Sequence, residues 1–440
     1  MGICIIILKS HQVLARETTC YIGGGAYSST GPIATSVPFL SMEQAYRMGS
    51  VRYNGYRIYT NKPIRGMIRT HGRGFACGID LQLDMIADHL GIDPVEMRLK
   101  NSRQPGEYTS TKFYVDLCAM DETIHKAVEK SGFKKKWGKL PPFHGIGMGT
   151  NSVQTEFPMG IRGGSQSFIK FNEDGEATVM SGVVDNGQGN DNMLIQIAAE
   201  ELGLLPEDIH LVSADTETTS SDPGSYSQVS TFVGGHAVKI AAQNCREKLF
   251  NVAAKALKVN PDQLAAKNRL IFVKDDPGSK RGKASKSIPI KKVVRIALLN
   301  YTSVNAEGGY WPKVDMKREW VKNPYGQMCE AFSFGTTIVE VKVDPDTGQV
   351  EVLEVTVAQD VGYGINPLVL EGQFEGALTM GGQVVCSQNT MNGRMAGASI
   401  PTCWIINCPW PVICRLKSII SLWNPLIPKD PTGPRKPACP

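Results

Sequence analysis

The sequence predicts an α+β protein made of two similar lobes, each combining a hairpin or small sheet with helices. The main observation is that one unit, a hairpin followed by an aspartate, a glycine-containing turn and a helix, occurs twice, once from residue 167 and again from residue 338. The length of 440 residues allows two to four domains, and 42% hydrophobic and 20% charged residues are typical of a folded globular protein. Two such lobes facing each other would enclose a ligand cleft, although duplication of a stable unit explains the repeat equally well.

Charge and cysteine content exclude several classes of protein. A net charge of +5 is too small for a nucleic-acid groove, and the lysine run at 134–136 has an ordinary explanation as a solvated segment, so no nucleic-acid partner is expected. The eleven cysteines form no C-x-x-C pair, which predicts free thiols in a reducing compartment. The apolar stretch at 3–8 is too short for a bilayer-spanning helix and lacks a basic flank, so we expect a cytoplasmic protein without a membrane partner.

The first third of the chain contains strands and then helices. Residues 1–30 favour strand segments, and apolar residues at helical spacing over 81–90 predict a helix that ends before Gly91. Asp93 and Pro94 then supply an N-cap and a proline at the first position of a second helix. Residues 121–132 predict an amphipathic helix.

A charged, proline-containing stretch at 134–142 is expected to be a linker. It would separate a first domain, residues 1–133, from a second, residues 143–385. The tail at 386–440 holds five of the eleven cysteines and nine of the 26 prolines, and no helical or strand period is visible in it. We expect this tail to be aberrant and loosely folded, as it would be if part of it were translated out of the original reading frame. We expect no metal site in it, because no histidine follows His236.

The two copies of the repeated unit can be followed residue by residue. In the first, strands at 167–171 and 177–181 flank a turn, and a helix follows near 194–202. In the second, strands at 338–343 and 350–357 flank another turn, and a helix begins at about Pro367.

Three segments could carry chemistry, and each has a structural explanation beside the functional one. The turn Asp185, Asn186, Gly187, Gln188 and Gly189 could present backbone amides to a polar or anionic ligand, or simply begin a helix. The hydroxyl-rich segment with Gln228, Val229, Ser230 and Thr231 could wrap a polar cofactor or cap a helix. Gln373 lies between two glycines within a helix, which costs about 1 kcal/mol per glycine and indicates close packing on a helix or a ligand.

Common catalytic motifs are missing. The sequence has no G-x-x-x-x-G-K-[ST], H-E-x-x-H or G-x-S-x-G, which excludes the usual nucleotide hydrolases, zinc proteases and serine hydrolases. The alternating glycines at 145–149 do not follow the dinucleotide-binding pattern and are typical of a strand at a sheet edge.

Taken in order, these segments resemble the molybdenum-binding large subunit of the xanthine dehydrogenase and aldehyde oxidase family, closest to hydroxybenzoyl-CoA reductase and nicotinate dehydrogenase types. The resemblance covers residues 12–383. It is carried by the following segments: residues 24–27, 59–63, Arg69 and Gly72, 93–101, 187–189, 230–231, 360–362, 366–367 and 372–376.

The resemblance implies a molybdopterin, in the cytosine dinucleotide form, held without a protein ligand to the molybdenum. Gln188 and its glycines would contact the pterin, and Gln228 to Thr231 would line the dinucleotide. Gln373 would donate or accept a hydrogen bond from the second lobe. Arg69 and Gly72 would belong to the arginine-containing cofactor loop, although Arg73 to Phe75 offers a second register.

Departures from the family pattern predict a fragment that is inactive alone. The family's catalytic glutamate lies near the C-terminus, but no glutamate follows Glu375, so we assign no catalytic residue. The upstream substrate domain is also missing, which makes the chain similar to a middle portion of such a subunit.

The family's substrates are aromatic heterocycles, aromatic acyl-CoA compounds or aldehydes. Partner subunits would carry the [2Fe-2S] centres and FAD, and a companion large-subunit chain could supply the missing glutamate. The alternative is a degenerate, non-catalytic product or a subunit-interaction module.

Overall fold

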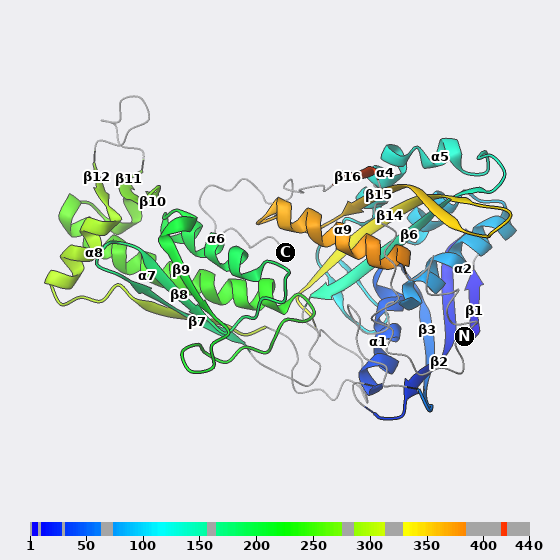
Figure 1. Ribbon diagram of the computed structural model, residues 1–440, viewed down its shortest axis with the longest axis horizontal. Coiled ribbons are helices and arrows are strands. Elements are labelled where there is room, and N and C mark those ends of the chain that lie inside the picture. The colour runs from blue at the N-terminus through cyan, green and yellow to red at the C-terminus, as the bar shows by residue number, and fades with distance from the viewer. Residues whose placement is uncertain are drawn as a thin grey trace. The chain divides into compact units, whose positions relative to one another are not determined.

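The computed structural model describes residues 2–7, 10–28, 31–62, 74–155, 164–274, 286–312, 329–383 and 415–419. Their contacts divide the chain into two compact units (Figure 1). Unit 1 comprises residues 1–154, 318–327 and 331–439, and unit 2 comprises residues 155–317 and 328–330.

Unit 1 contains two larger sheets, the two-stranded sheet β4-β5, and the helices packed on them. Its elements are β1 (Gly2–Ile7), β2 (Val13–Gly25), α1 (Gly31–Gln44), β3 (Ser50–Tyr59), α2 (Gly74–Leu90), α3 (Pro94–Asn101), β4 (Glu107–Tyr108), β5 (Tyr114–Val115), α4 (Met120–Ser131), α5 (Phe133–Lys136), β6 (His144–Thr155), β14 (Ala331–Val343), β15 (Val350–Gln359), α9 (Pro367–Gln383) and β16 (Arg415–Ile419). One sheet has the order β1-β2-β3 and the other the order β16-β15-β14-β6. The buried face of α4, with Ile124 and Ala127, packs on β14 and β15, where Phe334 and Ile338 are also buried.

Unit 2 is a four-stranded sheet with helices on one side and a small second sheet. Its elements are β7 (Ser165–Phe171), β8 (Ala177–Ser181), α6 (Asn190–Leu202), β9 (Ile209–Ser213), α7 (Gly235–Leu257), β10 (Leu264–Lys267), β11 (Leu270–Val273), β12 (Ser287–Pro289), α8 (Ile290–Leu299) and β13 (Ala306–Tyr310). Short turns of helix lie at Pro206–Asp208, Ser230–Gly234 and Pro261–Gln263. The main sheet has the order β13-β7-β8-β9, and α6 and α7 pack against each other and against its strands (Figure 1).

The repeated unit is confirmed, with one copy in each compact unit. In unit 2 the antiparallel hairpin β7-β8 leads into α6, and β9 then pairs parallel to β8. In unit 1 the antiparallel hairpin β14-β15 leads into α9, and β16 pairs parallel to β15. Hairpin, helix and parallel strand therefore follow in the same order twice, and the predicted α+β class is confirmed.

Local sequence signals account for most of the expected elements. The second helix begins at Pro94, and Asp93 caps it by accepting a hydrogen bond from the Val95 amide at 2.8 Å. The amphipathic helix predicted at 121–132 is α4, which ends at Gly132 in the left-handed conformation. The glycines at 145–149 lie in β6, an edge strand. The helix predicted over 81–90 is longer than expected, because α2 already begins at Gly74.

The domain limits expected from the sequence, with a linker at 134–142, remain a prediction. Phe133–Lys136 form the short helix α5, and Lys136 pairs with Glu340 and Glu354 of the hairpin in unit 1. The tail at 386–440 lies outside the described residues except for β16.

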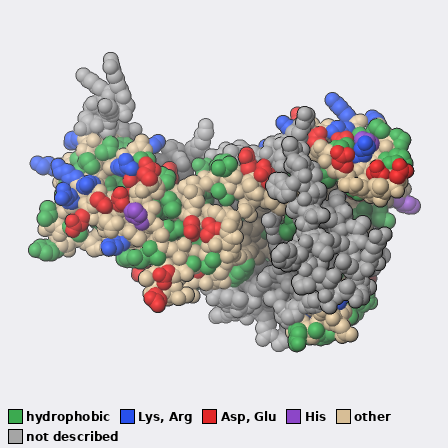
Figure 2. Space-filling model, in the orientation of Figure 1, with side chains coloured by type: hydrophobic (Ala, Val, Ile, Leu, Met, Phe, Trp, Pro, Cys, Tyr) green, Lys and Arg blue, Asp and Glu red, His purple; other side chains and the backbone are tan. Residues whose placement is uncertain are grey.

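Three further findings concern surface charge, hydropathy and the cysteines. The face drawn in Figure 2 shows acidic and basic side chains interspersed over the part of unit 2 around α8. Within the described ranges, no helix is both long and apolar enough to cross a membrane. The cysteines placed there, at positions 20, 77, 118, 245 and 329, are free thiols.

Candidate functional site

The turn that precedes α6 is organised by the carboxylate of Asp185. Its Oδ1 accepts hydrogen bonds from the amides of Gly187 at 2.7 Å and Gly189 at 3.3 Å, and its Oδ2 accepts from the amide of Asp191 at 3.2 Å. Partial burial alone would raise the pKa of Asp185, but these amides outweigh it and hold the pKa below its usual range. The carboxylate is therefore ionised at neutral pH and already balances the positive end of α6.

Gln188 and its glycines shape the rest of this turn. Gly187 and Gly189 have φ values of 97° and 82°, which favour glycine, and a Cβ placed on Gly187 would meet nothing within 4 Å. The Gln188 Oε1 accepts from the Asn186 amide at 2.6 Å, and its Nε2 lies 3.4 Å from the Val184 carbonyl. The backbone at Gly187 thus faces open space, while the Gln188 side chain folds over its own turn.

The hydroxyl-rich segment before α7 has an unusual backbone. Ser227 and Gln228 have positive φ values of 44° and 57°, and residues Ser230–Gly234 form a π-helical turn. Left-handed conformations at non-glycine residues cost of order 1–3 kcal/mol each, and π turns occur frequently at functional sites. Val229 and Ser230 are buried, while Thr231 is half-buried.

The two segments meet in unit 2. The hydroxyl of Ser225 donates to the carbonyl of Val184, immediately before Asp185. The hydroxyl of Ser230 donates to that of Ser225 at 3.0 Å. The structure therefore brings together two of the three predicted segments, 186–189 and 228–231, on one polar surface.

The chemistry of this surface fits a molybdopterin. The surface offers hydroxyl, amide and backbone groups, and the carboxylate oxygens Asp191 Oδ1 and Asp222 Oδ2 are buried without a hydrogen-bond partner among the described residues. A pterin ring carries N–H groups that such acceptors bind, and unpaired buried acceptors cost free energy unless a donor reaches them. Because Asp185 already occupies the amides at the start of α6, this turn suits a polar ring better than a phosphate.

The remaining predicted residues lie elsewhere. Gln373 is exposed on α9 in unit 1, so it belongs to a different compact unit from Gln188 and Ser230. Arg69 and Gly72 lie outside the described residues. Among the residues that the structure describes, no three histidine, cysteine or acidic side chains gather in a way that could hold a metal ion.

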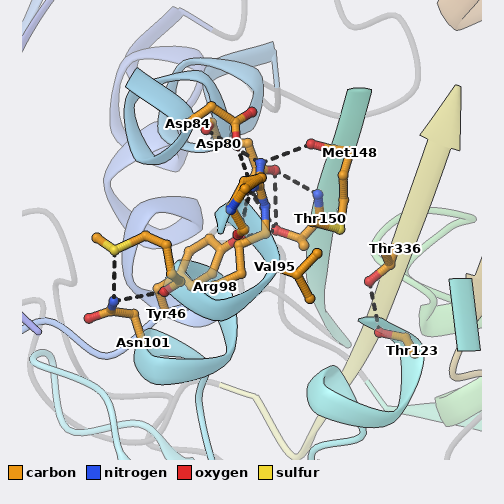
Figure 3. Close-up of polar contacts among 12 residues, drawn as sticks. Tyr46, Asp80, Asp84, Val95, Arg98, Asn101, Thr123, Met148, Thr150 and Thr336 are labelled. Atoms are coloured by element: carbon orange, nitrogen blue, oxygen red, sulfur yellow. Dashed lines mark hydrogen bonds and ion pairs between the residues drawn. The ribbon is translucent and has the colours of Figure 1, made fainter. Parts of the chain in front are cut away.

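Sequence reasoning missed a buried ionic network in unit 1 (Figure 3). The Arg98 side chain is fully buried, pairs with Asp80 and Asp84, and donates to the Met148 carbonyl at 2.9 Å. Asp80 also accepts from the Tyr46 hydroxyl at 2.6 Å and from the Thr150 amide at 2.6 Å. This network joins α2, α3 and β6, and its saturated bonding indicates a structural role for the 93–101 segment. Its only signal in the sequence is a pair of acids one turn apart on a largely apolar helix face.

A second missed cluster lies beside the π turn in unit 2. His236 stacks on Tyr310 with ring centroids 4.5 Å apart, and Phe232 contacts both rings edge-on. The Tyr310 hydroxyl donates to Glu330. The i,i+4 spacing of Phe232 and His236 is the signal that the sequence offers, but their pairing with Tyr310 joins segments far apart in the sequence.

Two family models match this chain, and both describe a molybdopterin cofactor-binding domain. They match residues 121–408 and residues 6–102. The first match alone covers more than half of the chain.

Curated relatives and solved structures agree with these models. A putative xanthine dehydrogenase molybdenum-binding subunit of Escherichia coli is 26% identical over 368 residues, covering 81% of this chain and 46% of that protein. The gamma subunit of the 6-hydroxypseudooxynicotine dehydrogenase complex of Paenarthrobacter nicotinovorans is 25% identical and covers 84% of this chain and 46% of its own length. Quinoline 2-oxidoreductase from Pseudomonas putida has a similar fold, with a TM-score of 0.72 and 20% identity over 86% of this chain and 49% of that one. The chain thus spans about half the length of the relatives it matches.

Proposed function

Because the chain belongs to the molybdopterin-binding subunits of the xanthine dehydrogenase and aldehyde oxidase family, we propose that the adjoining segments 186–189 and 228–231 of unit 2 bind molybdopterin. The observation that carries this proposal is the junction between them, where Ser225 bonds to Val184 and Ser230 bonds to Ser225. Two polar segments joined in this way form one surface rather than two separate helix caps.

Within this proposal the two segments have different tasks. Gln188, with Asn186, Gly187 and Gly189, contacts the pterin, because Asp185 has already neutralised the amides that would attract an anion. The hydroxyls of Ser230 and Thr231, with Gln228 and Val229, line the cytosine dinucleotide part. The Thr231 hydroxyl is a neutral donor that suits phosphate and ribose oxygens, and the Ser230 oxygen, whose proton goes to Ser225, can accept from a ribose hydroxyl.

Three further residues keep the roles that the sequence predicts for them. Gln373, on α9 of unit 1, would offer a side-chain amide to the cofactor, and Arg69 and Gly72 would belong to a further cofactor loop. When bound, the molybdenum cofactor supplies two-electron redox chemistry. This chain's own residues hold and orient it through hydrogen bonds, and none of them is assigned a catalytic role.

We further propose that the chain has little or no turnover alone, in a family that oxidises or reduces aromatic or aldehyde carbons. We propose that a companion chain supplies the proton acceptor for this reaction. Loss of a general base typically lowers the rate 10²–10⁴-fold. The alternative is a degenerate, non-catalytic product or a subunit-interaction module.

Partner subunits would take up the electrons in the cytoplasm. The relative from Paenarthrobacter nicotinovorans is named as the gamma subunit of a complex, which supports a multi-subunit assembly. We propose that partners carry [2Fe-2S] centres and FAD, because five free thiols are scattered over the described residues and no cluster of ligands is present among them.

The proposal can be tested on the purified full chain by measuring molybdenum and the fluorescence of oxidised pterin. We expect both to copurify with the wild-type chain and to fall several-fold in Thr231→Val. The control is Thr302→Val, which removes the same hydroxyl from an exposed threonine of unit 2 whose hydroxyl bonds to Asn300. Equal cofactor content in both variants would contradict the assignment. Restored dye reduction on adding a companion chain would separate the companion model from the non-catalytic alternative.

A further inference from the structure

The π turn that carries Ser230 and Thr231 has one side chain packed directly behind it. His236 lies in the first turn of α7, and its Nδ1 forms a hydrogen bond with the carbonyl of Phe232, inside the π turn. A carbonyl oxygen can only accept, so Nδ1 carries the proton in this contact. The imidazole therefore binds the turn by a directed bond as well as by packing.

The imidazole is itself held from the opposite side. Its ring stacks on Tyr310 at 4.5 Å with an angle of 21° between the planes, and the Tyr310 hydroxyl donates to Glu330. Tyr310 ends β13 and pairs with Ser165 of β7, so its position is fixed by the main sheet of unit 2. A chain of contacts thus runs from the sheet through Tyr310 and His236 to the carbonyl of Phe232.

The space around this turn leaves little room for another arrangement. A Cβ on Gly234 would lie 2.4 Å from the Val183 side chain, next to the Val184 carbonyl that Ser225 binds. Phe232 is buried and contacts the rings of both His236 and Tyr310. The turn is therefore packed against Val183, just after β8, on one side and on the ring cluster on the other.

We propose that His236 is a positioning residue for the cofactor segment: it holds the π turn that carries Ser230 and Thr231 in the conformation that the bound ligand requires. This inference rests on the proposed cofactor site, but it assigns a role to a residue that would not itself touch the cofactor. Burial lowers the pKa of His236, with Lys239 adding to this effect and the Phe232 carbonyl and Glu330 opposing it. The ring is therefore neutral at pH 7 and donates through the Nδ1 tautomer.

The test uses two substitutions that separate the hydrogen bond from the ring. His236→Phe keeps an aromatic ring on Tyr310 but removes the donor, whereas His236→Asn loses most of the ring and keeps an N–H at the position of Nδ1. A matched control is His210→Phe, at an exposed histidine of unit 2 that pairs with Glu176. Each variant is made in the full chain and measured for peptide-resolved hydrogen exchange over residues 225–236 and for pterin content.

We expect His236→Phe to speed exchange in this segment at least tenfold and to lower pterin content several-fold, with His236→Asn restoring both towards wild type. The control should change neither. If His236→Phe leaves exchange over 225–236 unchanged, or if His236→Asn is as impaired as His236→Phe, the positioning role is wrong. The exchange measurement needs no cofactor, so a wild-type chain that binds no pterin would contradict the proposed function while the positioning role is still decided.

Discussion

The two copies of the hairpin, aspartate and helix unit have an aspartate at the equivalent position, but its carboxyl group lies in opposite environments. In unit 2, Asp185 is partly exposed and its carboxylate receives the amides of Gly187, Gly189 and Asp191. In unit 1, Asp360 receives the Gly362 amide at 3.1 Å, and burial, together with the nearby Glu122, raises its pKa. One copy therefore presents an ionised turn whose carboxylate is bound by amides, and the other holds a half-buried carboxyl group whose pKa is raised.

The difference shows how one sequence pattern can serve two purposes. Both copies have glycine two residues after the aspartate, so both form the same local turn. In unit 2 the next residues lead within one turn into α6 and leave Gly187 exposed. In unit 1 the main chain at Asp360 is bound instead, because its amide donates to Phe334 and its carbonyl accepts from Ser333. The first turn is exposed at Gly187, whereas the main chain of the second is hydrogen-bonded to the neighbouring strand β14.

The largest effect is expected from removing the charge of each aspartate. Asp185→Asn should lower the stability of unit 2 by about 1–2 kcal/mol, because hydrogen bonds to a charged acceptor are stronger than those to a neutral one. Asp360→Asn should leave unit 1 unchanged or stabilise it at pH 7, because it removes a charge that burial disfavours. Urea unfolding followed by peptide-resolved hydrogen exchange measures both, and equal destabilisation would break the comparison.

The same contrast predicts opposite responses to acid. Asp360 has a raised pKa in the folded chain, so its contribution to stability is largest below its unfolded pKa of about 3.9 and is lost as the pH rises through the folded value. Asp185 has a lowered pKa, so its contribution is present above about pH 4 and is lost as the pH falls through the folded value.

The two pH dependences can be measured as the difference in unfolding free energy between wild type and each variant. Between pH 7 and pH 4.5, wild-type unit 1 should gain stability relative to the Asp360→Asn variant, while unit 2 should keep a constant difference from Asp185→Asn. Comparing each variant with wild type removes the contributions of other buried acids, such as Asp80 and Glu43, whose pKa values are also raised. A unit 1 difference that does not change with pH would contradict the assignment to Asp360.

The glycines after the two aspartates should differ by a smaller amount. Gly187 has φ at 97°, outside the left-handed region that other residues reach, whereas Gly362 has φ at 62° inside it. Gly187→Ala should therefore cost about 1–2 kcal/mol and Gly362→Ala about 1 kcal/mol. Because nothing lies within 4 Å of a Cβ on Gly187, steric clash does not contribute there. Thermal unfolding of both variants against wild type decides the order.

The smallest effect on stability is expected from the two glutamines that follow the aspartates. Gln188→Ala removes the acceptor for the Asn186 amide and should cost about 0.5–1 kcal/mol. Gln373→Ala lies on an exposed face of α9 and should stay within about 0.5 kcal/mol of wild type. Both should lower pterin content if both contact the cofactor, and an unchanged content in either variant removes that glutamine from the proposed site.

Local sequence signals are enough to predict the repeat, whereas the environment of its aspartates and the ring cluster depend on long-range packing. The hairpins, the Asp93 cap and the start of α9 at Pro367 depend on residues a few positions apart. The direction in which the pKa of an aspartate shifts depends on distant segments, as the charge of Glu122 on α4 shows at Asp360. The ring cluster of His236 and Tyr310 likewise joins segments that no sequence window spans.

The account depends most directly on one ligand occupying the surface formed by the turn at 184–191 and the segment at 225–234. Hydrogen exchange of the full chain, purified from a host that makes molybdopterin and from one that does not, tests this. We predict that cofactor protects the amides of these two segments together, more than any other part of unit 2. Protection of only one segment, or of neither while pterin remains bound, would contradict the account.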